Sequence, residues 1–350
     1  MRENMKKELT ISDTKMLQGL AVFMMVVLHL FDRYNYKDLY QPLCYLKGYP
    51  VVFYFAQLSD CCVMVFAFCS GYALYKQYKK VSVVEYYRGR LKSLFVLMIN
   101  YWLILFLFTG ISLIMGKGKE MPGSVVEFIG NFLTINTTYN GAWWYLFIYI
   151  ILVAMSPLIF VSCNKMPIGV NGFLLISIYI SAYYVRFHHE SANWFLTKYG
   201  LWGMTVFEFC MGIYFYKLNC LDIIDKVKKK IPKGGAIVIC ILVCAGMLIG
   251  HTLIIPSLFI APLTGLIIII LFTSWNKPHI VESIFLILGK HSTNIWLIHM
   301  FFFLYIFKNL VFIGKYPVII LCIMLGICMV FSWMINKVLH PINTYIKKKF

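Results

Sequence analysis

Apolar runs of 17 or more residues recur along this chain from one end to the other, separated by short polar segments. Runs of that length cross the hydrocarbon core of a bilayer as helices. We expect membrane-spanning helices at residues 16–33, 51–75, 93–115, 143–162, 169–187, 200–217, 235–251, 256–274, 284–307 and 317–336. The pattern therefore predicts an all-α, polytopic membrane protein with about ten transmembrane helices in one bundle. No polar segment is long enough for a separate soluble domain, so we expect a single domain over residues 1–350.

The composition agrees with this prediction, since 61% of the residues are apolar and the mean hydropathy is +0.78. Charged residues make up only 13% of the chain, about half their usual share in soluble domains. The 11 cysteines form no pairs with zinc-site spacing, and most lie within predicted spans. We interpret them as small apolar packing residues, and we expect no metal site.

The net charge of +18 is distributed unevenly over the loops. With the N-terminus in the cytoplasm, 22 Lys and Arg residues fall on the cytoplasmic side and nine on the other. This is the positive-inside bias, and it predicts that both termini are cytoplasmic. The charge therefore sets orientation and favours contact with anionic lipids, and it does not indicate a nucleic-acid partner. The basic N-terminus before the first span resembles a secretory signal, but its apolar run is long and no cleavage pattern follows, so we expect an uncleaved span.

The first predicted span carries a stripe of polar residues. Gln18 and His29 are 11 residues apart, which puts both on one helix face with a separation of about 16 Å, and Lys15 lies one turn before Gln18. A lipid-facing helix has no use for such a stripe, so we expect it to face the bundle interior, where an ionisable side chain usually marks a site. The alternative is a histidine near the outer end of the span that rests among the lipid headgroups.

Four further ionisable residues fall at a comparable depth of the predicted bundle. Asp32 is one turn beyond His29, Asp60 lies in the outer third of the second span, Glu208 is near the middle of the sixth, and His299 lies in the outer half of the ninth. Each would cost several kcal/mol (roughly) if it were buried without a partner. Together they favour a functional site over isolated structural polar residues.

Basic and aromatic residues frame this predicted site from both sides of the membrane. Arg88, Arg90 and Lys92 stand at the cytoplasmic mouth of the third span. On the external side, residues 125–135 suit a short interfacial helix after Pro122-Gly123-Ser124, and Trp143 and Trp144 open the fourth span, where an aromatic belt is expected.

The order and spacing of several short motifs resemble the acyltransferase 3 family of integral-membrane acyltransferases, and the resemblance runs nearly from end to end. The motifs are the histidine of the first span, Ser70-Gly71, Arg88-Gly89-Arg90-Leu91-Lys92, Asn140-Gly141-Ala142-Trp143-Trp144 with Pro157 closing the fourth span, Phe209-Cys210-Met211-Gly212, and Leu288-Gly289 through His299.

The chain departs from the family pattern at four places. Gln18 stands where the family has Arg or Lys. Either Lys15 supplies that positive charge from one turn away, or the role of the charge is weakened in this chain. The double Phe before Ser-Gly is Phe66-Ala67, the usual pair of arginines is replaced by Arg90 and Ser93, and Tyr149 occupies the place of a glutamate that many members carry.

The resemblance implies a reaction and a role for each residue. A family member takes an acyl group, most commonly acetyl, from cytosolic acyl-CoA and delivers it to a hydroxyl of an extracytoplasmic or lipid-linked glycan. By this comparison His29 is the general base or a transient acyl carrier, and Asp60 or Asp32 fixes its tautomer. The phosphates of acetyl-CoA would pair with Arg88, Arg90 and Lys92, with Lys15 and Gln18 lining the path of its pantetheine arm. Candidate contacts to the oxyanion or to the acceptor are Ser70, Asn294, His299, Glu208, Trp143 and Trp144.

For several of these residues a structural role is an equal or stronger reading. Ser and Asn in spans often join helices, Trp143 and Trp144 suit a belt, and the basic mouth of the third span suits the positive-inside bias alone. A transporter or flippase of a lipid-linked glycan or a small acid is the main alternative function, although it would predict inverted repeats, which the sequence lacks. A glycan polymerase or ligase would normally need a larger external loop. We expect a multi-pass protein of a bacterial plasma membrane, since the high Ile, Phe, Tyr and Lys content is typical of an AT-rich genome.

Overall fold

The computed structural model describes residues 7–188, 193–251 and 257–349, and these are almost entirely helical. The described chain forms two compact units, each assembled from separate stretches of sequence. Unit 1 comprises residues 1–33, 44–80 and 155–290, and unit 2 comprises residues 34–43, 81–154 and 291–350. Two helices, α6 (Trp144–Lys165) and α12 (His279–Phe301), contribute residues to both.

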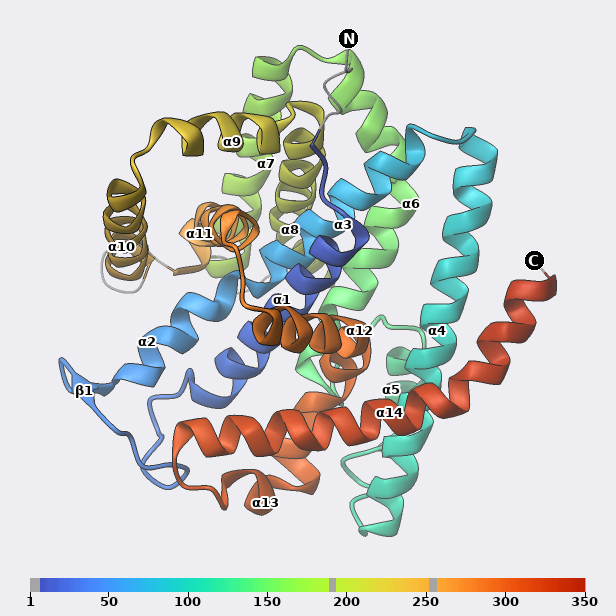
Figure 1. Ribbon diagram of the computed structural model, residues 1–350. Helices are drawn as coiled ribbons and strands as arrows, with labels where there is room; N and C mark the ends of the chain where they lie inside the picture. The colour runs from blue at the N-terminus through green and yellow to red at the C-terminus, as the bar shows by residue number, and fades with distance from the viewer. Residues whose placement is uncertain (1–6, 189–192, 252–256, 350) are drawn as a thin grey trace. The chain divides into compact units, whose positions relative to one another are not determined.

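Unit 1 holds the first helix and the middle of the chain (Figure 1). Its elements are α1 (Ile11–Phe31), the short antiparallel hairpin of β1 (Tyr45–Leu46) and β2 (Tyr49–Pro50), α2 (Val51–Leu58), the 3₁₀ turn η1 (Ser59–Cys61), α3 (Cys62–Tyr78), the second part of α6, α7 (Ile168–His188), α8 (Trp194–Lys217), α9 (Cys220–Lys230), α10 (Lys233–Ile249), α11 (Ser257–Ser274) and the first part of α12.

Unit 2 holds the long α4 and the C-terminal helix α14 (Figure 1). Its elements are α4 (Val83–Ile114), α5 (Val125–Phe132), the 3₁₀ turn η2 (Gly141–Trp143), the first part of α6, the second part of α12, the π-helical turn η4 (Phe302–Ile306), α13 (Lys308–Phe312) and α14 (Pro317–Lys349). A helix is present in the predicted range 125–135 as α5, which ends at Phe132, and Ser124 caps it by accepting a hydrogen bond from the main-chain N–H of Glu127.

Within the described residues, each of the ten predicted spans coincides with a helical segment, and residue 256, the first of the eighth span, lies outside them. Only part of this set meets the usual requirements for crossing a membrane. Among the described residues, six segments are both long and apolar enough: Ile11–Phe31, Val51–Tyr78, Val83–Ile114, Gly141–Lys165, Ile168–His188 and Pro317–Ile346. The protein is therefore a multi-pass membrane protein, and the number ten stays a prediction. The prediction that Pro157 closes the fourth span is wrong, because Pro157 lies inside α6, which continues to Lys165.

Helix starts follow local capping chemistry. Thr10 accepts a hydrogen bond from the main-chain N–H of Asp13, whose carboxylate accepts from the main-chain N–H of Thr10 in return. Ser82 and Glu85 form the same reciprocal pair at the start of α4. Such capping boxes pair main-chain donors that the first helical turn leaves unused.

Two helices of unit 1 cross closely at positions that are occupied by glycines. A side chain at Gly71 of α3 would collide with the main chain of Phe209 in α8, and one at Gly212 of α8 would collide with the main chain of Phe68 in α3. Small residues let helices in membranes approach closely, which replaces the hydrophobic driving force that water supplies elsewhere. The Ser70-Gly71 motif thus marks a helix crossing that fixes α3 against α8.

Candidate functional site

Lys15 and Gln18 of α1 form one polar pair. The Lys15 ammonium donates a hydrogen bond of 3.0 Å to the side-chain oxygen of Gln18. Lys15 also interacts electrostatically with Cys69 of α3, which α1 packs against. This part of the stripe therefore faces protein, and Lys15 gives it a positive charge although Gln18 itself has none.

His29 lies on the same helix, in its last turn, and is half-buried. Its main-chain oxygen accepts a hydrogen bond of 3.3 Å from the Arg33 guanidinium. Asp32 follows α1 directly, where burial and the neighbouring Asp60 carboxylate raise the pKa of its carboxyl, against an opposing effect of Arg33. The C-terminal end of α1 therefore places an imidazole, a guanidinium and a carboxyl group within two turns of chain.

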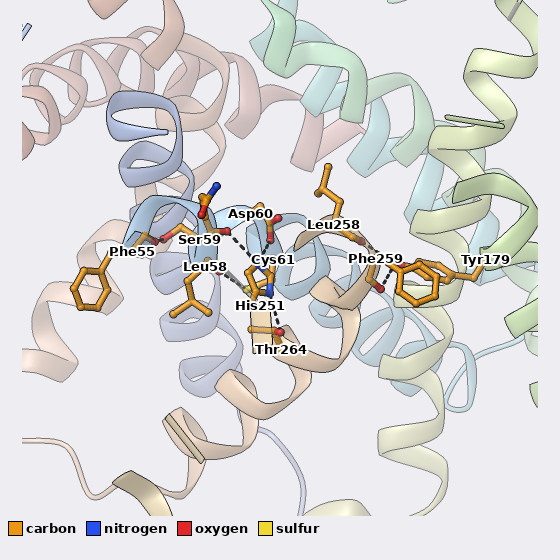
Figure 2. Close-up of polar contacts among 11 residues, drawn as sticks. Phe55, Leu58, Ser59, Asp60, Cys61, Tyr179, His251, Leu258, Phe259 and Thr264 are labelled. Carbon is orange, nitrogen blue, oxygen red and sulfur yellow. Dashed lines mark hydrogen bonds and ion pairs between the residues drawn. The ribbon is translucent and has the colours of Figure 1, made fainter. Parts of the chain in front are cut away.

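Asp60 lies in η1 and pairs with a histidine that we did not single out in the sequence. Its Oδ1 atom is 2.9 Å from Nε2 of His251, and Nδ1 of His251 is 2.9 Å from the hydroxyl of Thr264 in α11, as Figure 2 shows. All three side chains are buried, with exposed fractions of 8%, 1% and 2% respectively. Asp60, one of the two carboxylates predicted to orient His29, thus has an imidazole of its own.

Glu208 and Ser70 lie elsewhere in unit 1. Glu208 is buried in α8 and interacts electrostatically with Arg186 and with Asp60. Ser70 donates its hydroxyl to the main-chain oxygen of Phe66 one turn earlier, within its own helix. The first residue therefore belongs to the same charged neighbourhood as Asp60, whereas Ser70 lies half-buried beside the glycine crossing.

In unit 2, Arg90 is one of three basic residues near the start of α4, and it is half-buried. Its guanidinium lies 5.7 Å from the ring centre of Tyr86 and within electrostatic range of Tyr149 on α6. The Nε atom of Arg90 is buried without a hydrogen-bond partner among the described residues. Arg88 is exposed and Lys92 is half-buried. Tyr149, which replaces the glutamate of many family members, thus lies close to the arginine.

The prediction that Trp143 anchors an aromatic belt is wrong. Trp143 is only 1% exposed, and its indole N–H donates to the main-chain oxygen of Leu297 at 2.9 Å. Asn140 donates to the same oxygen at 3.0 Å, so the Asn140–Trp144 motif attaches η2 to α12. Trp144 is half-buried and meets Tyr145 edge to face.

Asn294 and His299 lie on the part of α12 that belongs to unit 2. Asn294 accepts a hydrogen bond of 2.7 Å from Asn100 of α4 and donates one of 2.9 Å to Asn336 of α14, so it joins three helices. His299 is fully buried, and its Nδ1 atom lies 2.8 Å from the main-chain oxygen of Trp296. That contact places a proton on Nδ1, because a carbonyl oxygen can only accept. The hydrogen bonds of the Asn294 amide, by contrast, join helices of unit 2 to one another.

No group of three or more His, Cys, Asp or Glu side chains within residues 7–188, 193–251 and 257–349 is arranged to hold a metal ion.

Comparison with known proteins identifies the class. The model of the acyltransferase 3 family, described as an acyltransferase domain, matches residues 14–337, which is nearly the whole chain. The protein belongs to this family and is an acyltransferase of the general membrane-bound kind. No curated protein and no solved structure matches the chain significantly.

The residue that sequence reasoning missed is His251. It is the last residue of the predicted span 235–251, where a histidine is easily explained by the membrane–water interface. Its partners lie on other elements, since Asp60 belongs to η1 and Thr264 to α11. A usable signal was the presence of one histidine at the edge of an otherwise apolar span.

Proposed function

We propose that this protein is an O-acyltransferase of a bacterial plasma membrane, which takes an acyl group, most simply acetyl, from cytosolic acyl-CoA. The acceptor is a hydroxyl of an extracytoplasmic or lipid-linked glycan. The observation that carries the proposal is the polar stripe of α1. Its Lys15–Gln18 pair places a positive charge on the protein-facing side of the helix, close to the position where the family has Arg or Lys.

In the proposed reaction the acceptor hydroxyl attacks the thioester carbonyl carbon while neutral His29 removes its proton. The new C–O bond forms, the C–S bond breaks, and the proton passes from the imidazolium to the leaving thiolate, giving the ester and free CoA. Arg33 is anchored on the His29 main chain, since its guanidinium donates a hydrogen bond to the His29 main-chain oxygen.

The cytoplasmic mouth of α4 is the proposed contact of the CoA phosphates. Arg90 supports this role, since its buried Nε donor has no hydrogen-bond partner among the described residues and its guanidinium is held against an aromatic ring. Guanidinium groups match phosphate geometry with paired donors. Arg88 and Lys92 would add charge around it.

The test is the O-acyl content of surface polysaccharide, measured by proton NMR. A deletion strain is complemented with the wild type, with His29→Ala, or with His279→Gln as a matched control at an exposed histidine. We expect wild type and control to restore the ester signals, and His29→Ala to leave them absent at unchanged polymer yield. Full acylation by His29→Ala would refute the mechanism, and loss of polymer from the surface of the deletion strain would favour the flippase alternative.

A further inference from the structure

A pocket in unit 2, at the C-terminal end of α4, has no part in the mechanism above. Its cavity volume is about 290 Å³, near the lower limit of roughly 300–1,000 Å³ for sites that bind small molecules. Three segments line it: the end of α4 with the loop that follows, the end of the loop between α5 and η2, and the segment from the end of α12 through η4. All three segments belong to unit 2, so the pocket forms within one compact unit.

Hydrogen bonds fix the loop between α4 and α5 as one wall of this pocket. The main-chain oxygen of Lys117 accepts from the Ser112 hydroxyl at 3.2 Å and from the main-chain N–H of Met121 at 3.1 Å. The Tyr139 hydroxyl donates to the main-chain oxygen of Pro122 at 2.5 Å, which joins this loop to the segment before η2. The protein's own hydrogen bonds thus hold the lining in place, and a pre-formed site loses less conformational freedom when a ligand binds.

The wall that follows α12 contains the π-helical turn η4. Within it the main-chain N–H of Phe307 donates to the main-chain oxygen of Phe302, five residues earlier, at 3.0 Å. Turns of this kind are rare and occur frequently at functional sites. Here the turn contributes Tyr305 and Ile306 to the pocket. Tyr305 is 40% exposed, so a large part of this aromatic residue is open to contact with a ligand.

The lining combines aromatic side chains with a pair of opposite charges. Phe301 and Tyr305 supply the rings, and Lys117 and Glu120 supply a hydrogen-bond donor and an acceptor. The Lys117 ammonium lies 3.5 Å from the main-chain oxygen of Tyr305, so the positive charge and the exposed aromatic residue are neighbours. A sugar ring has an apolar face of C–H groups and a rim of hydroxyls that both donate and accept, and this lining complements both parts. An acyl chain would use only the apolar part, and an acidic group would meet the Glu120 carboxylate.

We infer that this pocket binds one neutral sugar residue of the glycan acceptor. Tyr305 contacts the apolar face of the sugar ring, while Lys117 donates to its hydroxyls and Glu120 accepts from them. The inference rests on the proposed function, because the glycan is the acceptor named there. The predicted orientation agrees with this role, since it places the loop of residues 116–142 on the external side, where an extracytoplasmic glycan is available.

The first experiment measures binding without an acyl donor. Mild acid releases oligosaccharides from the de-esterified surface polysaccharide, and anion exchange separates them into a neutral and an acidic fraction. Saturation-transfer NMR then measures their binding to the purified protein in lipid nanodiscs. We expect Tyr305→Leu, Lys117→Met and Glu120→Gln each to weaken binding of the neutral fraction on the order of tenfold. The matched controls are Tyr316→Leu, at a tyrosine that is 43% exposed, and Lys119→Met, at an exposed lysine of the same loop outside the pocket lining, and both should bind like the wild type.

The second experiment measures acyl transfer from labelled acetyl-CoA to the neutral fraction. The three pocket variants should raise the KM for the oligosaccharide by a similar factor at unchanged kcat and unchanged unfolding temperature, because these residues hold the glycan and take no part in the bond changes. Folded pocket variants that bind the neutral fraction like the wild type, or a wild type that binds only the acidic fraction, would overturn the inference. If the wild type transfers no acyl group, the proposed function fails, while the binding measurements still decide whether the pocket holds a neutral sugar.

Discussion

At the scale of single residues, Asp32 offers a pH-dependent test of the outer end of α1. Burial and the Asp60 carboxylate raise the pKa of the Asp32 carboxyl above its ordinary value of about 3.9. A group with a raised folded-state pKa stabilises the folded protein below its ordinary pKa, and this stabilisation is lost as the pH rises through the raised value. We expect Asp32→Asn to show a smaller loss of thermal stability than the wild type between about pH 4 and neutral pH.

The measurement is the unfolding temperature in detergent over that pH range. Asp38→Asn, in the loop that follows α1, serves as the matched control and should keep the wild-type slope. The wild-type slope in Asp32→Asn would contradict the pKa argument. The effect is modest in size, because Asp32 is exposed and solvent screens its interactions.

Asn294 provides a second residue-scale prediction, for helix packing in unit 2. Its hydrogen bond with Asn100 should give a coupling free energy of about 0.6–1.7 kcal/mol in a double-mutant cycle of Asn100→Leu and Asn294→Leu. Reversible unfolding in mixed detergent measures the four free energies. Asn100→Leu combined with Asn171→Leu, a residue that bonds Ser162 in unit 1, should be additive. Additivity of the first pair would show that the contact is unimportant.

The residue scale also shows which parts of the candidate site the sequence could predict. Depth within an apolar run is enough to select His29, Asp60, Glu208 and His299, because burial of an ionisable group is costly wherever it occurs. Depth does not reveal partners. Asp60 pairs with His251 because η1 and the end of α10 meet in the folded unit, and the intrahelical hydrogen bond of Ser70 likewise depends on the rotamer that packing allows.

At the scale of elements, the crossing of α3 and α8 is the strongest prediction. Gly71→Ala places a methyl group against the Phe209 main chain, which cannot move without displacing α8. We expect a loss of about 1–3 kcal/mol in unfolding free energy, or failure to fold. Gly110→Ala in α4 is the matched control, since nothing lies near its Cβ position, and it should be neutral or stabilising. A neutral Gly71→Ala would mean that the two helices do not cross there.

Elements were more predictable than the contacts between them. The ten apolar runs fall on helices, and the Ser124 cap marks the start of α5, because both features depend on local sequence. Pro157 misled the prediction of a boundary, since α6 passes through it and a proline inside a membrane helix can be accommodated by neighbouring groups. The prediction for Trp143 failed for another reason, because its indole N–H donates a hydrogen bond to a main-chain oxygen of α12 and the ring does not lie at the membrane surface.

At the scale of the whole molecule, the charge distribution predicts orientation. The 22-to-nine division of Lys and Arg places the loop with residues 34–50 outside and the loop with residues 79–82 in the cytoplasm. The two compact units draw on interleaved stretches of sequence, so no composition boundary could have revealed them. Orientation, by contrast, depends only on which loops carry the charge, and it can be tested on the intact protein.

Native Cys44 is exposed in the first of these loops, and it makes the orientation measurable. A membrane-impermeant thiol reagent should label it in intact cells, and Cys44→Ser should abolish that labelling. Lys80→Cys in the Cys44→Ser background should be labelled only after the membrane is permeabilised, because residue 80 follows α3 on the cytoplasmic side. Labelling of Lys80→Cys in intact cells together with protection of Cys44 would reverse the orientation. The CoA-binding role of Arg90 would then fail as well, since α4 begins beside residue 80 and its basic mouth would face away from the cytosolic donor.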